Sequence, residues 1–418
     1  MRSVQDKISV GVDIGTHKIA ISVGQVREGL INIAALASSP SAGLRRGQII
    51  DPEEVVSSLS AAIEDAQRIS GQEITNAIVG YGGVGISTTS SRGVVAISRP
   101  DGEINEEDME RVMEAAKSVA LPPNLDIIHL FPTNYTIDSQ ENTKDPRGLR
   151  GVRLEIDALT IGAPAANIRN LTNVANQAGI DINAIAYNPI AAARAILTKK
   201  QKENGVLLID IGAATTSMVV YEEGDIIDAF VIPIGSSHIT NDIAIGLKTT
   251  LEVAEKIKCH HLNADPDKVK ETDRLDLSKI TEHEDEKVSK KFITEIVDAR
   301  LKEIFTHVRK ELKRIKRDSL LPAGAVLTGG GSKLPGIISQ AKDNLHLPVQ
   351  PGMPIIEIGA TIDKLDDPSY ATSIGLSLMG LEMDNAPDNS RVARFDIKNI
   401  KLGGVVNRAK SIFKQLLP

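Results

Sequence analysis

One short pattern occurs twice in this 418-residue chain and constrains its fold more than any other feature. In each copy a short apolar strand leads into Asp-Ile-Gly, a tight turn follows, and a second apolar strand continues the chain. The first copy extends from Ile8 to Val23 and the second from Val206 to Tyr221. Two copies of one strand-turn-strand unit predict an internally duplicated, two-lobed α/β fold.

The two turns carry the residue types that a phosphate site needs. A tight turn between adjacent strands points successive backbone N–H groups into one concavity, which suits phosphate oxygens. We expect Gly15 and Gly212 to allow positive φ and close backbone approach, and Lys18 to supply positive charge. The candidate set is Asp13, Gly15, Thr16, His17, Lys18, Asp210, Gly212, Ala213, Ala214, Thr215 and Thr216.

The two aspartates of these turns are the candidate metal ligands. Asp13 and Asp210 lie at strand ends, where they are placed to hold Mg²⁺ through its water molecules, because Mg²⁺ keeps much of its hydration. Either copy alone reads as an ordinary hairpin with an aspartate at the bend. Two copies in opposite halves favour a shared site.

Two later segments add candidate nucleotide contacts. An apolar strand runs into Gly329-Gly330-Gly331, with Lys333 close behind. We expect these glycines to let a base and ribose lie against backbone, the alternative being a flexible turn. Glu252, Glu255 and Lys258 fall on one helix, and Glu255 and Lys258 share a face from which they could bond the ribose hydroxyls and base edge. Taken alone, this pair reads as a surface ion pair.

The rest of the chain divides into two inserts and a tail. A β-α-β-β insert is expected from Val84 to about Gly162, with a helix that Asn105 caps. The second insert holds two helices and a charged stretch, which we interpret as a solvated loop from Asn263 to Lys290. The main part of the first lobe is expected at 1–83 and 163–200, with its insert at 84–162. The main part of the second lobe is expected at 201–235 and 319–382, with its insert at 236–318, and the segment 319–382 also contains the end of the first lobe. A flexible linker is expected at 383–403 and a terminal helix at 404–418.

Charge and composition exclude several classes of protein. The formal net charge of −7 argues against general nucleic-acid binding, and the single cysteine excludes a disulfide framework. The charge is unevenly spread, because residues 391–418 contain seven Lys or Arg and one Asp. Their net +6 leaves −13 for the rest of the chain, so an acidic body carries a basic tail.

The basic tail ends in an amphipathic helix of about 21 Å, too short to cross a bilayer. Apolar residues recur along it at helical spacing, and cations fill the other face, a pattern typical of a helix lying in an anionic membrane surface. The alternative is a terminal helix docked on the protein's own core. The candidate membrane-binding residues are Val405, Val406, Arg408, Ala409, Lys410, Ile412, Phe413, Lys414, Leu416 and Leu417.

The four nucleotide motifs, in this order, resemble the site of the actin, heat-shock and sugar-kinase superfamily. The string from Asp145 to Glu155 and the first insert narrow the resemblance to the FtsA family of bacterial actin-like division proteins. The resemblance covers nearly the whole chain. It implies a bilobed, ribonuclease H-like duplicated α/β fold with an FtsA-type insert and a C-terminal amphipathic helix.

The resemblance also implies a function. It implies ATP and Mg²⁺ in the cleft, head-to-tail polymers, peripheral attachment to the inner face of the cytoplasmic membrane at the septum, and contact with other division proteins. It further implies tethering of the tubulin-like protein FtsZ, whose C-terminal peptide docks on the second insert in this family. Arg300 matches a basic family position there.

Three residues depart from the family pattern. Ala213 and Ala214 stand where the second turn usually has glycines, and each adds a Cβ and penalises positive φ. Asn188 stands where rod-shape relatives have a Glu that orients the attacking water. Because an amide is no base, we expect weak or no ATPase activity, well below the ~10 s⁻¹ typical of enzymes.

Two other functions fit parts of the pattern. A pilus-assembly ATPase of the PilM type shares the fold and first insert, but the linker and basic terminal helix favour the division protein. A small-molecule kinase of the sugar-kinase branch needs an acceptor pocket with an Asp base, for which the sequence has no distinct signal.

The terminal helix generates a direct prediction. Phe413→Asp places a charge in the apolar stripe, so we expect the full chain to lose co-sedimentation with anionic liposomes. Unchanged co-sedimentation would contradict membrane binding through this helix.

Overall fold

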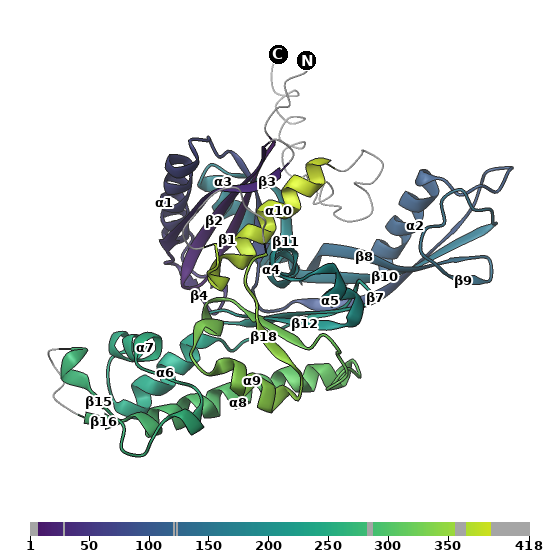
Figure 1. The fold of residues 1–418 in the computed structure, drawn as a ribbon. Coiled ribbons are helices and arrows are strands. Elements are labelled where there is room, and N and C mark those ends of the chain that lie inside the picture. The colour runs from purple at the N-terminus through teal and green to yellow at the C-terminus, as the bar shows by residue number, and fades with distance from the viewer. Residues whose placement is uncertain are drawn as a thin grey trace, which may run out of the picture.

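The computed structural model describes residues 7–27, 30–119, 122, 124–281, 287–355 and 365–385, which form two lobes and an inserted subdomain (Figure 1). The terminal helix expected at 404–418 and most of the expected linker lie outside the described residues. No helix within the described ranges is long and apolar enough to cross a membrane.

The two main sheets have the same topology. The first has the order β11-β6-β1-β2-β3 and the second β14-β13-β12-β17-β18, so each combines a three-stranded antiparallel meander with two parallel strands. This confirms the predicted duplication. The first sheet comprises β1 (Lys7–Ile14), β2 (Lys18–Arg27), β3 (Leu30–Pro40), β6 (Asn76–Tyr81) and β11 (Asp181–Tyr187). The second comprises β12 (Val206–Ile211), β13 (Thr216–Glu222), β14 (Asp225–Ile232), β17 (Ala325–Thr328) and β18 (Val349–Pro351).

The first insert is a separate small sheet that extends from one side of the lobes in Figure 1. Its strands are β7 (Ser87–Ala96), β8 (Leu125–Ile137), β9 (Gln140–Thr143) and β10 (Arg153–Pro164), in the order β7-β10-β8-β9. Helix α2 (Glu106–Val119) packs against β7 and β10 around its own apolar core. Asn105 caps α2 as predicted, accepting from the Asp108 N–H at 3.0 Å. Strand β9 was not anticipated.

The helices follow the apolar spacing of the sequence. Asp51 caps the first of them, since its Oδ1 accepts from the N–H groups of Glu53 and Glu54. The helices are α1 (Pro52–Ser70), α3 (Ala165–Gln177), α4 (Asn188–Ile196), α5 (Lys199–Asn204), α6 (Ser236–Leu247), α7 (Leu251–His260), α8 (Lys290–Arg314), α9 (Ile337–Leu345) and α10 (Ala371–Asn385).

The charged stretch of the second insert is more ordered than a solvated loop. Two short strands, β15 (Arg274–Asp276) and β16 (Lys287–Ser289), pair there, and Leu275 and Leu277 are buried. The expectation of a simple loop was therefore wrong, because two leucines among the charges provide a small apolar anchor. Helix α6 of the same insert was also not anticipated.

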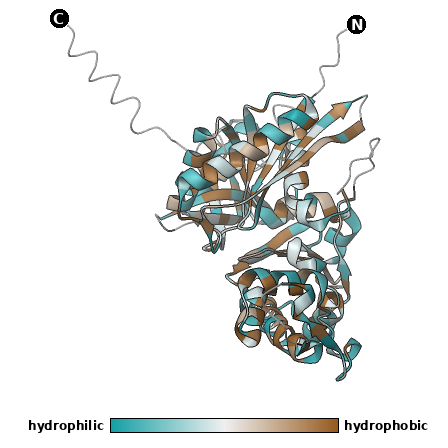
Figure 2. Ribbon diagram, turned by 90° about the vertical axis from the view of Figure 1, so that its left-hand side faces the viewer, coloured by the Kyte–Doolittle hydropathy of each residue, from teal (hydrophilic) through white to brown (hydrophobic). Residues whose placement is uncertain are grey.

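Strand β12 lies between two apolar cores. Val206 and Leu208 face a core shared with the first lobe, whereas Leu207 and Ile209 face the core of the second lobe. This fits a strand covered on both faces, which reads as a continuous apolar run. Figure 2 shows the apolar colouring concentrated on the strands and on the inner sides of the helices.

The last described helix packs tightly into the first lobe. A Cβ on Gly375 of α10 would lie 1.8 Å from the Ala191 carbonyl oxygen, and one on Gly11 of β1 would lie 2.2 Å from the Ser373 carbonyl oxygen. Only glycine permits such close contact of backbones. Helix α10 continues to Asn385, so residues 383–385, expected in the linker, are helical.

Tyr187 of the first lobe forms hydrogen bonds with both the first insert and the second lobe. It is fully buried at the end of β11, and its N–H donates to His129 Nε2 of the insert at 2.9 Å. Its hydroxyl donates to the Phe230 carbonyl at 2.7 Å and accepts from the Met218 N–H at 3.3 Å, both in the second lobe.

Tyr187→Phe keeps the ring but leaves these two buried backbone groups without their partner. We expect unfolding free energy to fall by about 1–3 kcal/mol, measured by denaturant titration. Tyr81→Phe removes a hydroxyl that donates to the Val84 carbonyl and accepts from Asn167 Nδ2, both outside the second lobe, so it is the comparison for a tyrosine that does not bridge the lobes. Equal stability of Tyr187→Phe and the parent chain would contradict the bridging role.

Candidate nucleotide site

A cleft of about 680 Å³ lies between the lobes, and both Asp-Ile-Gly turns line it. The structure brings together most of the residues predicted from the sequence. Those that line the cleft are Asp13, Gly15, Thr16, His17, Lys18, Asp210, Gly212, Ala213, Ala214, Thr215, Glu255, Lys258, Gly329, Gly330, Gly331 and Lys333. Thr216 and Glu252 are not among them.

The two turns are built alike. The Gly15 N–H donates to the Lys18 carbonyl at 3.1 Å, and the Gly212 N–H donates to the Thr215 carbonyl at 2.9 Å. Neither glycine has positive φ, so that expectation was wrong. Close approach explains the glycines instead, since a Cβ on Gly15 would lie 2.9 Å from the Lys18 carbonyl oxygen.

The alanines of the second turn impose no left-handed strain. Ala213 and Ala214 are absent from the positive-φ positions, so the expected φ penalty does not arise. Behind them, the N–H groups of Ser236 and Ser237 donate to the carbonyls of Gly212 and Ala213. The start of α6 thereby holds the turn in place.

Asp13 and Asp210 are partly buried and close enough to affect each other electrostatically. Burial raises the pKa of Asp13 to about 6, against the opposing effects of the Lys18 charge and an Asn188 hydrogen bond. Burial, followed by the negative charge of Asp13, raises the pKa of Asp210 to about 7. The Thr372 hydroxyl, 3.4 Å from Asp210 Oδ2, acts in the opposite direction.

Lys18 reaches across to the segment that precedes α10. Its Nζ donates to Ser369 Oγ at 2.7 Å and lies 3.3 Å from the centroid of the Tyr370 ring, a cation–π contact. Burial lowers the pKa of Lys18. This ammonium group is therefore partly desolvated and lies at the cleft wall, where a phosphate would strengthen its charged state.

Contacts within the protein itself require glycine at two of the three positions of the glycine loop. A Cβ on Gly329, whose φ is +84°, would lie 2.2 Å from Asp210 Oδ1, and one on Gly331 would lie 2.5 Å from Ile211 Cγ2. These glycines let the loop pack against the end of β12. Gly330 is open, with Ser369 Cβ the nearest atom at 4.0 Å, so it retains space for a ligand.

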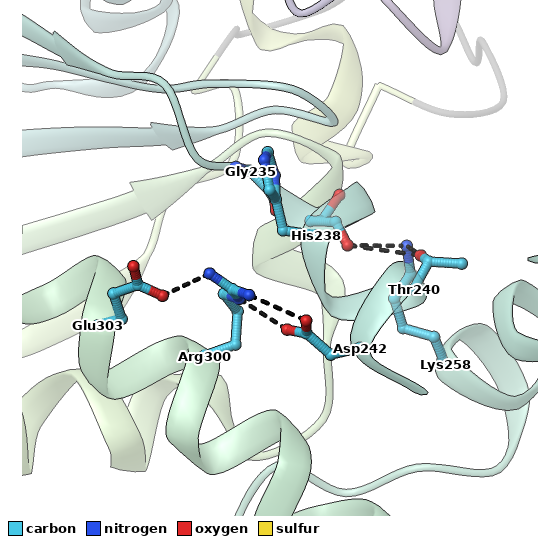
Figure 3. Close-up of polar contacts among 8 residues, drawn as sticks. Gly235, His238, Thr240, Asp242, Lys258, Arg300 and Glu303 are labelled. Carbon is cyan, nitrogen blue, oxygen red and sulfur yellow. Dashed lines mark hydrogen bonds and ion pairs between the residues drawn. The ribbon is translucent and has the colours of Figure 1, made fainter. Parts of the chain in front are cut away.

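Three polar side chains from helices α6 and α7, two of which line the cleft, are hydrogen-bonded to one another (Figure 3). Lys258 Nζ lies 2.7 Å from Glu255 Oε2 and donates to Thr240 Oγ1 at 2.9 Å. The Thr240 hydroxyl in turn donates to Glu255 Oε2. The predicted shared face of Glu255 and Lys258 is confirmed, and Thr240 is a further member that the sequence did not reveal.

Glu252 and Thr216 lie away from the cleft. Glu252 has a side chain 79% exposed and pairs with Lys256 one turn along the helix, so it points to solvent. Thr216 is fully buried and donates to the Ile234 carbonyl at 2.8 Å. Both were misplaced because one residue of offset changes the face of a helix or strand.

Several cleft residues were missed by sequence reasoning. Asp367 pairs with Lys333 at 2.9 Å and caps a short 3-10 helix, η4 (Pro368–Tyr370), next to Ser369. The Asp-Pro start of η4 is a helix signal, but nothing in the sequence places it beside the two turns. The segment Gly80–Gly83 at the end of β6 also lines the cleft, and its three glycines were the available signal.

Arg300 lies on α8, outside the cleft lining (Figure 3). Its Nε and Nη2 donate to the two carboxylate oxygens of Asp242 at 2.6 and 2.9 Å, and it also pairs with Glu303. Its guanidinium is thus already held by two carboxylates. An acidic partner at this position would have to share or displace them.

The residues present fit a magnesium nucleotide. The cleft volume is in the range of ordinary ligand sites. Mg²⁺ is usually held by one or two carboxylates together with phosphates and waters, and Asp13 and Asp210 supply two. Within the described ranges no group of three or more His, Cys, Asp or Glu could hold a metal ion. This donor set suits Mg²⁺ bound with a phosphate ligand better than a metal held by protein alone.

Duplicated sheets around a central cleft define an actin-like protein. Solved structures support this class. The PilM-PilN type IV pilus biogenesis complex matches with a TM-score of 0.65 and 18% identity, covering 89% of this chain and 98% of that one. MreB5 of Spiroplasma citri bound to ADP matches with a TM-score of 0.54 and 15% identity, covering 91% and 98%.

Sequence comparisons narrow the class to one family. A family model described as cell division protein FtsA matches residues 207–375, and one described as the SHS2 domain inserted in FtsA matches residues 83–161. The chain is 36% identical to the cell division protein FtsA of Pseudomonas aeruginosa over 91% of each chain. It is 30% identical to that of Escherichia coli K12, over 91% of this chain and 92% of that one. The chain belongs to the FtsA family of bacterial actin-like cell-division proteins.

The carboxyl groups of Asp13 and Asp210 generate a prediction about pH. Both hold protons more tightly when folded than at their ordinary pKa of 3.8, so the folded state binds more protons between about pH 4 and 7. Their contribution to stability is therefore lost as pH rises through this window. In thermal melts of the nucleotide-free protein, we expect Asp210→Asn to soften the decline of Tm with pH. Asp65→Asn, on the exposed face of α1, should leave the decline unchanged, and equal slopes for all three proteins would contradict the prediction.

Proposed function

We propose that this chain binds ATP together with Mg²⁺ in the cleft and hydrolyses ATP weakly or not at all. The observation that carries the proposal is the pair of partly buried carboxylates, Asp13 and Asp210, facing one cleft with Lys18 at its wall. When bound, Mg²⁺ would neutralise the two carboxylates and the phosphates together. Asn188 supplies an amide where a general base would be needed, which supports slow hydrolysis.

We further propose that ATP binding supports head-to-tail self-assembly into actin-like filaments that tether FtsZ. Membership of the FtsA family and the actin-like fold support this. The C-terminal peptide of FtsZ is proposed to dock near Arg300, where it would compete with Asp242 and Glu303 for the guanidinium. Other division proteins are expected partners, and nucleic acid is not.

The proposed location is the inner face of the cytoplasmic membrane at the division septum, as a peripheral protein. Support comes from the sequence of residues 391–418, whose net charge of +6 and apolar stripe suit an anionic lipid surface. The acidic remainder of the chain would be held off the same surface by repulsion.

The two alternatives have weaker support. The PilM–PilN structure shares the fold at 18% identity, well below the 36% identity to a cell division protein FtsA. A small-molecule kinase would transfer phosphate to an acceptor, so phosphorylation of any small acceptor would favour it.

Electron microscopy on anionic lipid monolayers tests the proposal. The full chain should form lipid-bound filaments with ATP and Mg²⁺ but not without nucleotide. A chain ending at Asn385, where α10 ends, should retain ATP binding in calorimetry and lose the lipid-bound filaments.

A matched pair of lysine variants distinguishes a specific role of Lys18 in ATP binding from the general effect of removing one positive charge. Lys18→Ala should weaken ATP binding by roughly tenfold or more, as expected for a lost charged hydrogen bond. Lys199→Ala removes a side chain that is 91% exposed on α5 and should bind ATP as the parent chain does. Equal ATP affinity of Lys18→Ala and the parent chain would refute the proposed phosphate site.

A further inference from the structure

Three parallel strands end at one edge of the first sheet and bring three segments together. Strand β6 pairs in parallel with β1 on one side, with Val12 opposite Val79, and with β11 on the other, with Tyr187 opposite Tyr81. The carboxyl ends of these strands therefore reach the same corner of the cleft. There Asp13 meets Asn188, with the backbone of Gly80–Gly82 between them.

Asn188 contacts Asp13 directly. Its Nδ2 donates to Asp13 Oδ1 at 3.0 Å, whereas its Oδ1 is buried and has no hydrogen-bond partner within the part of the chain that the structure describes. The amide leaves the second Asp13 oxygen for other ligands. Because an amide donates without adding charge, it can orient a carboxylate at a site where a third acidic group would add repulsion.

The space that Asn188 occupies depends on two glycines. A Cβ on Gly80 would lie 2.4 Å from Asn188 Oδ1, and a Cβ on Gly82 would lie 2.7 Å from Asn188 Nδ2. Any side chain at either position would push the amide away from Asp13. The backbone of Asn188 is fixed from the other side by Tyr187 and its bonds to the insert and to the second lobe.

We propose that Asn188 is a positioning residue for the magnesium nucleotide. It holds one oxygen of Asp13 so that the other faces the cleft, where it would accept from a water of the cation. This inference rests on the proposed ATP and Mg²⁺ binding and deepens it. It assigns to Asn188 an effect on the Mg²⁺ dependence of ATP binding, distinct from its lack of basicity in hydrolysis.

The test measures ATP affinity by calorimetry in Mg²⁺ and in EDTA, using the full chain. In Asn188→Ala, the gain in affinity that Mg²⁺ provides should fall about tenfold, as for loss of one hydrogen bond to a charged group. Affinity in EDTA should stay as in the parent chain. Gly80→Ala should reproduce this pattern with Asn188 still present. Asn183→Ala, on strand β11 just before Asn188 and bonded to Asn76 at the surface, is the matched control and should change neither value.

The outcomes distinguish failure of the inference about Asn188 from failure of the proposed ATP binding. If the parent chain binds ATP with a Mg²⁺ effect that Asn188→Ala keeps, the inference is overturned and the proposed function stands. If Asn188→Ala and Gly80→Ala lose affinity equally with and without Mg²⁺, the role is structural and the inference is again overturned. If the parent chain binds no ATP, the proposed function fails and the inference fails with it.

Discussion

The structure is organised around two partly buried carboxyl groups that face one cleft at the junction of its lobes. Asp13 and Asp210 are each the second-to-last residue of the first strand of a duplicated sheet, and the fold places them on one cleft, where burial raises the pKa of both. Several polar groups offset this unfavourable arrangement, among them Lys18 and Thr372. A pair of partly buried carboxylates is most stable with a cation, so the feature that costs stability in the protein alone suits the cleft to a metal-bound phosphate.

Segments far apart in the chain complete this cleft. Helix α10 and η4 come last among the described residues, yet Ser369 and Tyr370 hold Lys18, and the Pro368 carbonyl accepts from the Gly329 N–H. Close packing of α10 onto β1 and α4 makes this possible. The first lobe therefore needs the C-terminal part of the described chain to finish its own site, which couples the integrity of the cleft to long-range packing.

Glycines show where sequence reasoning reached its limit. Gly15 and Gly329 line the cleft, but the contacts that require glycine there are with the protein itself and not only with a ligand. Close contact with the Lys18 carbonyl and with Asp210 requires them, whereas positive φ occurs only at Gly329. A glycine in a sequence indicates that another group approaches the backbone closely at that position. Which group it is depends on the tertiary structure.

The sequence by itself determined the duplicated strand-turn-strand units and the capped helices α1 and α2, because these follow from local periodicity and capping. It also pointed to the two turns and the glycine loop, and most of the residues predicted from them line the cleft. Only the tertiary structure decided that Glu252 faces solvent, that Thr216 bonds inside the second lobe, and that Asn188 donates to Asp13. Local sequence patterns relate only residues that lie within a few positions of one another. The contact of Asn188 with Asp13 joins residues 175 positions apart, so it exists only once β1, β6 and β11 are aligned in one sheet.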